Sequence, residues 1–231
     1  MEFLKQKDNV CLNRIEIDVG DTGHITNCYA ICDGEGMSCI LFDPADKAEC
    51  IVKKLDSKGV TLKAICITHC HSDHISALED ICKIYKERGI KLKVYIHKND
   101  KAGLVDDKKN YAIMLGLKEI NVDDIEITDV DDGDIIKEGD VELEVLHTPG
   151  HTNGSIMFFA SNINSIITGD ILFSDCYGRV DLKSGNIKDM RKSIDKIFYR
   201  FNNIEIYPGH GESAVLSDIK RKIKLLLRIK K

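Results

Sequence analysis

The sequence predicts an α/β fold in which two mixed β-sheets pack face to face with helices on both outer sides, a four-layer αββα sandwich. Strand-type runs followed by helical periodicity occur twice, once before about residue 100 and once after about residue 134. Some of these runs are continuously apolar, which is typical of strands buried on both faces. No Pro- or Ser-rich linker separates the halves, so we expect a single domain over residues 1–231.

The first half begins with three short runs rich in Ile, Val, Tyr and Cys, at residues 11–18, 26–33 and 38–43. Turn-type residues separate them, which is typical of an antiparallel meander. Apolar residues then recur at helical spacing up to residue 57. Residues 64–67 form a continuous apolar run, and we expect this run to be a buried strand.

A crossover unit is expected next, because a helix and another strand follow in that order. Apolar residues recur at helical spacing from Ile75 to Tyr85, and Gly89 marks the end of this helix. Residues 92–97 form the next predicted strand. The pattern weakens over residues 99–132, where we expect a helix followed by a lid or loop over a functional site.

The second half repeats the order of strands and then helices. Its last helix is basic and amphipathic, which favours a packed outer helix with a solvated cationic face over a membrane-surface helix. The expected elements are hairpin strands at residues 135–137 and 141–147, paired strands at 156–160 and 165–168, a helix over 190–201, a strand at 204–207 and a helix from 216 onward.

Composition excludes several classes of protein. The chain of 231 residues is 43% hydrophobic and 31% charged, as expected for a globular domain. The net charge of −5 argues against a nucleic-acid partner, and no apolar run is long enough to span a membrane. Residues 1–10 lack the apolar core of a signal peptide, so we expect a cytoplasmic protein.

The nine cysteines are expected to be reduced thiols, because their number is odd and no secretion signal accompanies them. Cys70 and Cys176 lie close in sequence to candidate site residues, yet the ligand set described next is complete without sulfur. We therefore expect no catalytic cysteine. Five others lie in apolar surroundings and are expected in the core: Cys28, Cys32, Cys39, Cys66 and Cys82.

Residues 68–74 contain three histidines and an aspartate directly after an apolar run. His69 and His71 are two residues apart, so on an extended backbone both side chains leave the same face and can share one ion. Asp73 and His74 follow where the chain must turn, and they can address a second ion beside the first. Imidazole and carboxylate ligands suit Zn, Mn or non-haem Fe. The alternative is a polar turn in which the histidines are accidental.

Three further segments carry ligand-type residues at or just beyond the carboxyl ends of predicted strands. His151 follows a Thr-Pro-Gly turn, Asp170 follows Gly169, and His210 lies in a Pro-Gly-His-Gly turn. Loops at one edge of a rigid sheet are where functional sites are commonly built.

This order of motifs resembles the metallo-β-lactamase superfamily and, within it, the glyoxalase II-like (hydroxyacylglutathione hydrolase-like) branch. The resemblance covers nearly the whole chain and implies the metallo-β-lactamase fold. It also implies two divalent metal ions, zinc in the first place with iron or manganese as alternatives. The implied ligands are His69, His71 and His151 for the first ion, Asp73, His74 and His210 for the second, and Asp170 as the bridge between them.

The resemblance implies a metal-dependent hydrolase of a small-molecule substrate. A hydroxide between the ions would attack the carbonyl of a thioester or related compound, with Asp73 and Asp170 as catalytic residues. No Gly-x-Ser-x-Gly elbow and no phosphate-binding loop offers a competing mechanism. The oligomeric state, the acyl and thiol groups, and the native metal are left open.

The segment after Asp170 resembles the substrate-binding segment of the glyoxalase II-like proteins. Arg179 falls where the glutathione-specific enzymes have a cationic anchor, and we assign it to substrate binding together with Tyr177. The alternative for Arg179 is a surface salt bridge. Asp181 stands where those enzymes usually have an aromatic anchor, which leaves the use of glutathione open.

Three alternative functions remain at this stage: a persulfide dioxygenase with one iron on the same scaffold, a lactonase, and a non-catalytic metal-binding module. Metal content and oxygen consumption would separate the first from a hydrolase. The module is disfavoured because all seven ligand positions are filled. The remaining histidines, His24, His97 and His147, have no ligand position in the family and are expected to be structural.

Overall fold

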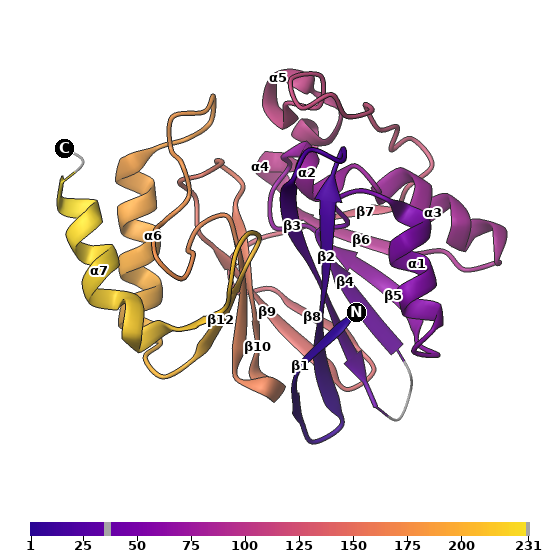
Figure 1. Cartoon of the computed structure of the whole chain (residues 1–231), viewed down its shortest axis with the longest axis horizontal. Coiled ribbons are helices and arrows are strands. Elements are labelled where there is room, and N and C mark those ends of the chain that lie inside the picture. Colours follow the sequence, from indigo (N-terminus) through magenta and orange to yellow (C-terminus); the bar gives the residue numbers. More distant parts are fainter. Residues whose placement is uncertain (35–37, 230–231) are drawn as a thin grey trace.

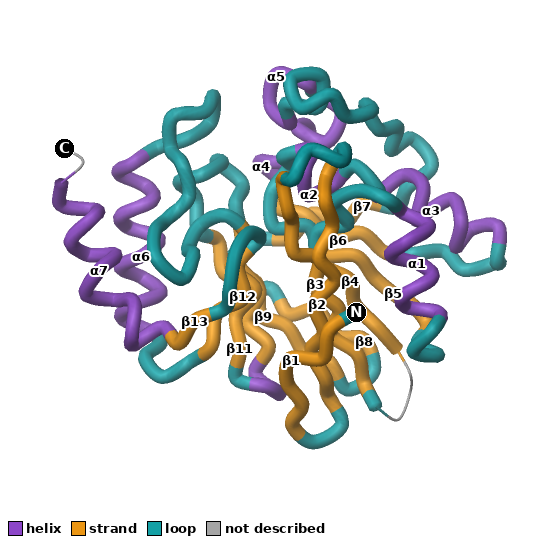
Figure 2. The backbone as a smooth tube through the Cα atoms, viewed as in Figure 1, coloured by secondary structure: helices purple, strands orange, loops and turns teal. Residues whose placement is uncertain are grey.

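The computed structural model describes residues 1–34 and 38–229 and contains two β-sheets packed face to face between two pairs of helices. Figure 1 shows α1 and α3 on one outer side and α6 and α7 on the other, with both sheets between them. Figure 2 shows long loops gathered along one edge of the sheets, at the top of the view. The expected four-layer αββα architecture is therefore confirmed.

The first sheet has seven strands in the order β1-β2-β3-β4-β5-β6-β7. Its first four strands pair antiparallel, and β4 to β7 pair parallel, so the sheet is mixed. The strands are β1 (Glu2–Lys7), β2 (Val10–Val19), β3 (His24–Asp33), β4 (Ser38–Phe42), β5 (Thr61–Cys66), β6 (Lys93–His97) and β7 (Ile127–Val130).

The second sheet has six strands in the order β13-β12-β11-β10-β9-β8. Only β11 and β12 pair parallel; the other neighbours are antiparallel. The strands are β8 (Ile135–Glu138), β9 (Val141–His147), β10 (Ile156–Ala160), β11 (Ser165–Gly169), β12 (Glu205–Pro208) and β13 (Ala214–Val215).

The long helices cover the outer faces of the sheets, and the short ones lie along the loop edge. The helices are α1 (Ala48–Asp56), α2 (Ser72–Ile75), α3 (Leu78–Glu87), α4 (Lys98–Lys101), α5 (Asp107–Asn110), α6 (Ile187–Arg200) and α7 (Leu216–Ile229), with 3-10 turns η1 (Ala102–Val105) and η2 (Ser161–Ile163). No helix within the described ranges combines the length and apolarity needed to cross a membrane.

Three apolar clusters hold the layers together. Residues such as Ile31 and Phe158 pack between the two sheets. Ile51 and Ile81 join α1 and α3 to the first sheet, and Ile194 belongs to the cluster that joins α6 and α7 to the second. Burial of apolar surface on both faces of each sheet keeps the strand ends rigid, and these ends carry the site.

The structure departs from the sequence-based expectations at several short elements. Strands β1, β7 and β13 were not predicted, because they are short and lie at or near the ends of the sheets, where one face carries polar residues. The helix expected from Ile75 to Gly89 is α3, and the short helix α2 before it was not predicted. In place of the single helix expected after residue 99, the chain forms three short elements, α4, η1 and α5, before strand β7.

Candidate metal centre

The histidine loop begins where β5 ends and continues into α2. His69 and His71 precede the helix, and His71 has an extended backbone at φ −66° and ψ 142°. Asp73 and His74 lie in the first turn of α2, so the helix start turns them toward the same region. β5 pairs parallel with β4 and β6, so the carboxyl ends of all three strands lie at the same edge.

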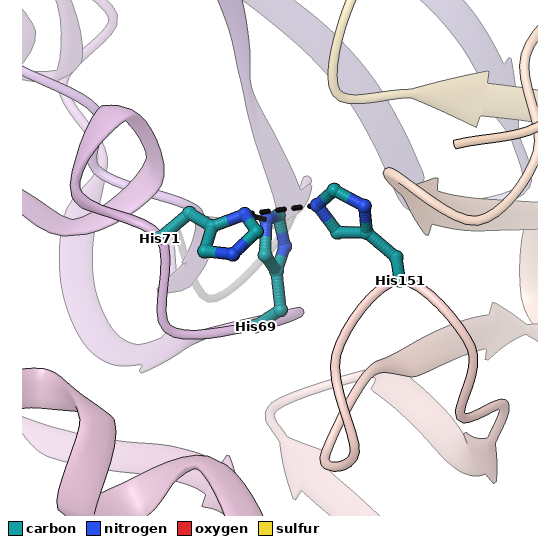
Figure 3. Close-up of side chains that lie close together, drawn as sticks. All are labelled: His69, His71 and His151. Atoms are coloured by element: carbon teal, nitrogen blue, oxygen red, sulfur yellow. Dashed lines mark hydrogen bonds between the residues drawn. The ribbon is translucent and has the colours of Figure 1, made fainter. Parts of the chain in front are cut away.

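His69, His71 and His151 form the first ligand group. Nδ1 of His71 lies 3.1 Å from Nε2 of His69 and 2.9 Å from Nε2 of His151. Figure 3 shows His69 and His71 on one loop and His151 on a facing loop, with the three rings pointing toward one another. All three side chains are buried. Bonds of about 2.0–2.1 Å to one zinc ion would place tetrahedral nitrogen ligands roughly 3.3 Å apart, close to these separations.

The hydrogen bonds behind the first ligand group direct bare nitrogen atoms inward. Nδ1 of His69 lies 3.0 Å from Oγ1 of Thr68, and that hydroxyl donates to Oδ2 of Asp43 at 2.7 Å, so the imidazole Nδ1–H is the donor. Nδ1 of His151 donates to the backbone oxygen of Arg179 at 2.8 Å. Both Nε2 atoms therefore present lone pairs to His71, which can offer only one proton in return. A cation between them satisfies all three.

Asp73, His74, His210 and Asp170 form the second ligand group. Nε2 of His74 lies 3.3 Å from Nε2 of His210. Oδ2 of Asp170 lies 3.4 Å from Nε2 of His210 and 3.7 Å from Nε2 of His151, so this carboxylate touches both groups. Oδ2 of Asp73 lies 3.4 Å from Nε2 of His210. The two groups are adjacent and share Asp170, as a two-metal site requires.

The two groups differ in electrostatics. Burial, together with the neighbouring imidazole of His151, lowers the pKa of His71 to about 3, and burial also lowers the pKa of His69. Burial acts in the same direction on His74 and His210, but the carboxylates of Asp170 and Asp73 outweigh it. The pKa of His210 is raised to about 10, and that of His74 is raised well above its usual value. Without metal, His69 and His71 are therefore neutral, whereas His210 pairs as an imidazolium with the carboxylates of Asp170 and Asp73.

Two features of the second ligand group fit a bound cation. Oδ1 of Asp170 is buried and, among the residues that the structure describes, accepts no hydrogen bond of normal geometry, although Nε2 of His74 lies 3.4 Å away. A Cβ atom at Gly209 would lie 2.4 Å from this oxygen and 2.5 Å from Cε1 of His74. Only a glycine at position 209 therefore lets the backbone pass this close to Asp170 and His74. The imidazole and carboxylate donors suit zinc, iron or manganese.

Two residues of the site were not predicted from the sequence. Asp43 is buried after β4 and accepts from Nδ1 of His74 at 3.0 Å and from Thr68. A carboxylate after an apolar strand next to the histidine loop could have indicated it. His24, which we expected to be structural, lies with Nε2 2.9 Å from Oδ2 of Asp73. Through this contact His24 orients a ligand, which is a structural role that the sequence did not specify.

The structure places the other histidines and the candidate substrate residues outside both ligand groups. His97 and His147 stack with ring centroids 3.9 Å apart and planes 10° apart, so their in-plane lone pairs run side by side rather than toward one point. The guanidinium of Arg179 pairs with Asp181. Tyr177 packs against the apolar cluster beneath α6 and α7. The assignment of Arg179 and Tyr177 to substrate binding stays a prediction.

Two aromatic side chains flank the centre on opposite sides. The ring of Tyr111 lies edge-on to His71 with centroids 5.4 Å apart, and the ring of Phe173 lies 6.2 Å from that of His210. The Tyr111 hydroxyl accepts a hydrogen bond from the backbone N–H of Lys183 at 2.9 Å. This bond connects the segment after α5 with the loop before α6, and neither aromatic residue was predicted from the sequence.

A two-sheet αββα fold with two adjacent His/Asp groups at its loop edge defines a metal-dependent hydrolase class. The family model described as "Metallo-beta-lactamase superfamily" matches residues 21–210, and the chain belongs to this superfamily. The sequence is 34% identical over 194 residues to the "Probable metallo-hydrolase YqgX" of Bacillus subtilis (strain 168), covering 83% of this chain and 88% of that protein.

Two further comparisons bear on the branch of the superfamily. The "Hydroxyacylglutathione hydrolase GloC" of Haemophilus influenzae is 28% identical over 196 residues, covering 84% of this chain and 90% of that protein. The crystal structure of the "BLEG-1 B3 metallo-beta-lactamase" aligns with a TM-score of 0.77 and 27% identity, covering 92% of this chain and 99% of that one. The expected superfamily is confirmed, and the similarity extends to proteins with different named activities.

Proposed function

We propose that the protein is a dinuclear metallohydrolase that cleaves a thioester or a related carbonyl compound. The observation that carries this proposal is the convergence of five imidazoles and two carboxylates into two adjacent ligand groups that share Asp170. The similarity to GloC, whose name describes hydrolysis of a hydroxyacyl thioester, supports the choice of substrate class.

The first ligand group would hold one divalent ion and the second ligand group the other, with zinc as the first candidate and iron or manganese as alternatives. Bound there, the ions would lower the pKa of water and polarise a carbonyl oxygen. The chain supplies the orientation. Oδ2 of Asp73 is held by His24 at 2.9 Å, so this carboxylate would keep a fixed orientation as a ligand and as an acceptor for a water molecule at the centre.

The residues behind the ligands determine which imidazole nitrogen atoms can bind metal. Asp43, Thr68 and the backbone oxygen of Arg179 fix the tautomers of three imidazoles, so their inward nitrogen atoms are not protonated in the loaded site. Tyr111 lies beside His71 and Phe173 beside His210, so both rings would contact a substrate bound at the centre. Arg179 would bind a substrate carboxylate in place of Asp181.

Elemental analysis of protein purified without added metal, combined with a substrate panel, tests the proposal. The panel contains a hydroxyacylglutathione thioester, a lactone, a chromogenic cephalosporin and glutathione persulfide with measurement of oxygen uptake. We expect about two metal ions per chain and thioester cleavage. One iron with oxygen uptake would instead indicate a dioxygenase, and cleavage of the lactone or cephalosporin alone would indicate a different hydrolase.

Asp170→Ala tests the bridging role. Removing this carboxylate takes one ligand from the second group and one of the buried counter-charges from His74 and His210. We expect turnover to fall at least 100-fold and metal content to fall to about one ion per chain. Wild-type turnover in this variant would contradict the assignment of Asp170.

A further inference from the structure

The segment that follows β6 reaches the metal centre through one buried side chain. Asp100 lies in α4, is 3% exposed, and does not touch either ligand group directly. Because β6 is the parallel neighbour of β5, the residues after β6 arrive at the edge where the histidine loop begins. Burial of a carboxylate costs free energy unless its oxygen atoms accept hydrogen bonds, so the partners of Asp100 indicate its role.

The Asp100 carboxylate connects the two loops that carry the first ligand group. Its Oδ2 accepts from the backbone N–H of Cys70 at 3.1 Å, and Cys70 lies between His69 and His71. The same oxygen accepts from Oγ1 of Thr152 at 2.6 Å, and Thr152 follows His151. Its Oδ1 accepts from the backbone N–H of Gly154 at 2.8 Å. One side chain thus ties both loops together.

Close packing supports this connection. A Cβ atom at Gly154 would lie 2.5 Å from Oδ1 of Asp100, and a Cβ atom at Gly103 would lie 2.3 Å from Sγ of Cys70. Both glycines therefore allow the segment after β6 to approach the ligand loops. The second ligand group has different supports, because Asp43 bonds His74, His24 bonds Asp73, and the backbone oxygen of Ile25 bonds Nδ1 of His210.

We propose that Asp100 is a positioning residue that sets the spacing of the His69–His71 loop and the His151 loop, and so the metal affinity of the first ligand group. It acts through backbone and hydroxyl donors rather than by touching the ion or the substrate. The proposal rests on the metal centre of the proposed function but not on the identity of its substrate. Buried supports of this kind are worth about 10- to 100-fold in metal affinity.

Asp100→Asn tests the proposal, because the amide keeps the size of the side chain and replaces one accepting oxygen with a donor. The measurement is zinc affinity by competition with a fluorescent chelator, in two backgrounds. In the His210→Ala background the second ligand group is weakened, so the measured zinc affinity is that of the first group. In the His151→Ala background the first group is weakened, so the measured affinity is that of the second. We expect Asp100→Asn to weaken zinc binding about 10- to 100-fold in the His210→Ala background and by less than about twofold in the His151→Ala background.

Asp106→Asn is the matched control. Asp106 lies in the same segment and accepts from the backbone N–H of Lys108, and Asn serves equally well at such a position. We expect wild-type affinity in both backgrounds. An equal loss of affinity from Asp100→Asn in both backgrounds would show a general structural defect, and no loss in the His210→Ala background would show that Asp100 does not position the group. Either result overturns the proposal.

Thr152→Val provides a second variant should Asp100→Asn fail to fold. It keeps the β-branched shape and removes only the hydroxyl that Asp100 accepts from. We expect a smaller loss of zinc affinity, about three- to tenfold, again confined to the His210→Ala background. Unchanged affinity there would contradict the proposal. Wild-type protein that binds no zinc would instead overturn the proposed function.

Discussion

Oδ2 of Asp43 lies 3.0 Å from Nδ1 of His74 and accepts its hydrogen, although 31 residues separate the two. The same oxygen accepts from Oγ1 of Thr68, which in turn accepts from Nδ1 of His69. One carboxylate therefore fixes an imidazole of each ligand group, directly in one case and through a hydroxyl in the other.

Asp43→Asn should weaken metal binding at both groups by about 10- to 100-fold. Asn is the appropriate replacement because Asp43 has φ +49°, a conformation that Asn adopts with little strain. Chelator competition measures the affinities. Asp46→Asn is the control in the same loop. The Asp46 carboxylate accepts from the backbone N–H groups of Gly20 and Lys47, so its replacement should leave the metal affinities unchanged. Wild-type affinity in Asp43→Asn would contradict the role of Asp43.

Metal binding at the second ligand group should release protons. The pKa of His210 is raised to about 10, so its imidazole is protonated at pH 8 without metal, and the pKa of His74 is raised in the same direction. Ligation requires both to be neutral. We expect at least one proton released per ion bound at this group, from His210, measured by calorimetry in two buffers of different ionisation enthalpy. Release of no protons would show that His210 is not protonated in the metal-free protein at this pH.

The same shift predicts how the stability of the metal-free protein depends on pH. A histidine whose pKa is higher in the folded than in the unfolded chain stabilises the fold most below its unfolded value, near 6.5. This contribution is lost as pH rises toward 10. The free energy of unfolding of metal-free protein should therefore fall between these values, and less steeply in His210→Gln. If the free energy of unfolding fell equally steeply with pH in the wild-type protein and in His210→Gln, the prediction would be refuted.

Gly209→Ala should disrupt the centre without removing a ligand. The added Cβ would lie 2.4 Å from Oδ1 of Asp170, so the carboxylate or the turn must move. We expect loss of about one ion per chain, measured by elemental analysis. Gly211→Ala is the control, since its Cβ meets nothing within 4 Å but its φ of +73° is strained. That variant should lose about 1 kcal/mol of stability and keep its metal.

Arg179→Gln should raise KM for a substrate with a free carboxylate about 10- to 100-fold and leave kcat nearly unchanged. The His151 contact uses the backbone oxygen of Arg179, so the metal centre is unaffected by the side-chain change. Asp181→Asn removes the carboxylate that pairs with the guanidinium and should lower KM. Arg88→Gln, which breaks a similar pair with Asp56, is the control. Equal KM values for all variants would exclude Arg179 as the anchor.

Much of the fold and the ligand set could be predicted from local pattern. Apolar periodicity identified the strands of the interior and the long helices, because burial on one or two faces leaves a period in the sequence. The short strand β7 escaped prediction, since its residues 127–130 are half polar and gain their pairing only from β6.

The seven side chains that make up the two ligand groups could be picked out from the sequence, because each lies at or beyond the end of an apolar strand and is of a ligand type. Only the tertiary structure decided what holds those ligands. Asp43, Asp100 and His24 act on partners 31, 52 and 49 residues away, respectively. A hydrogen bond across such separations leaves no local spacing to recognise, since the packing of strands and loops alone brings its two ends together.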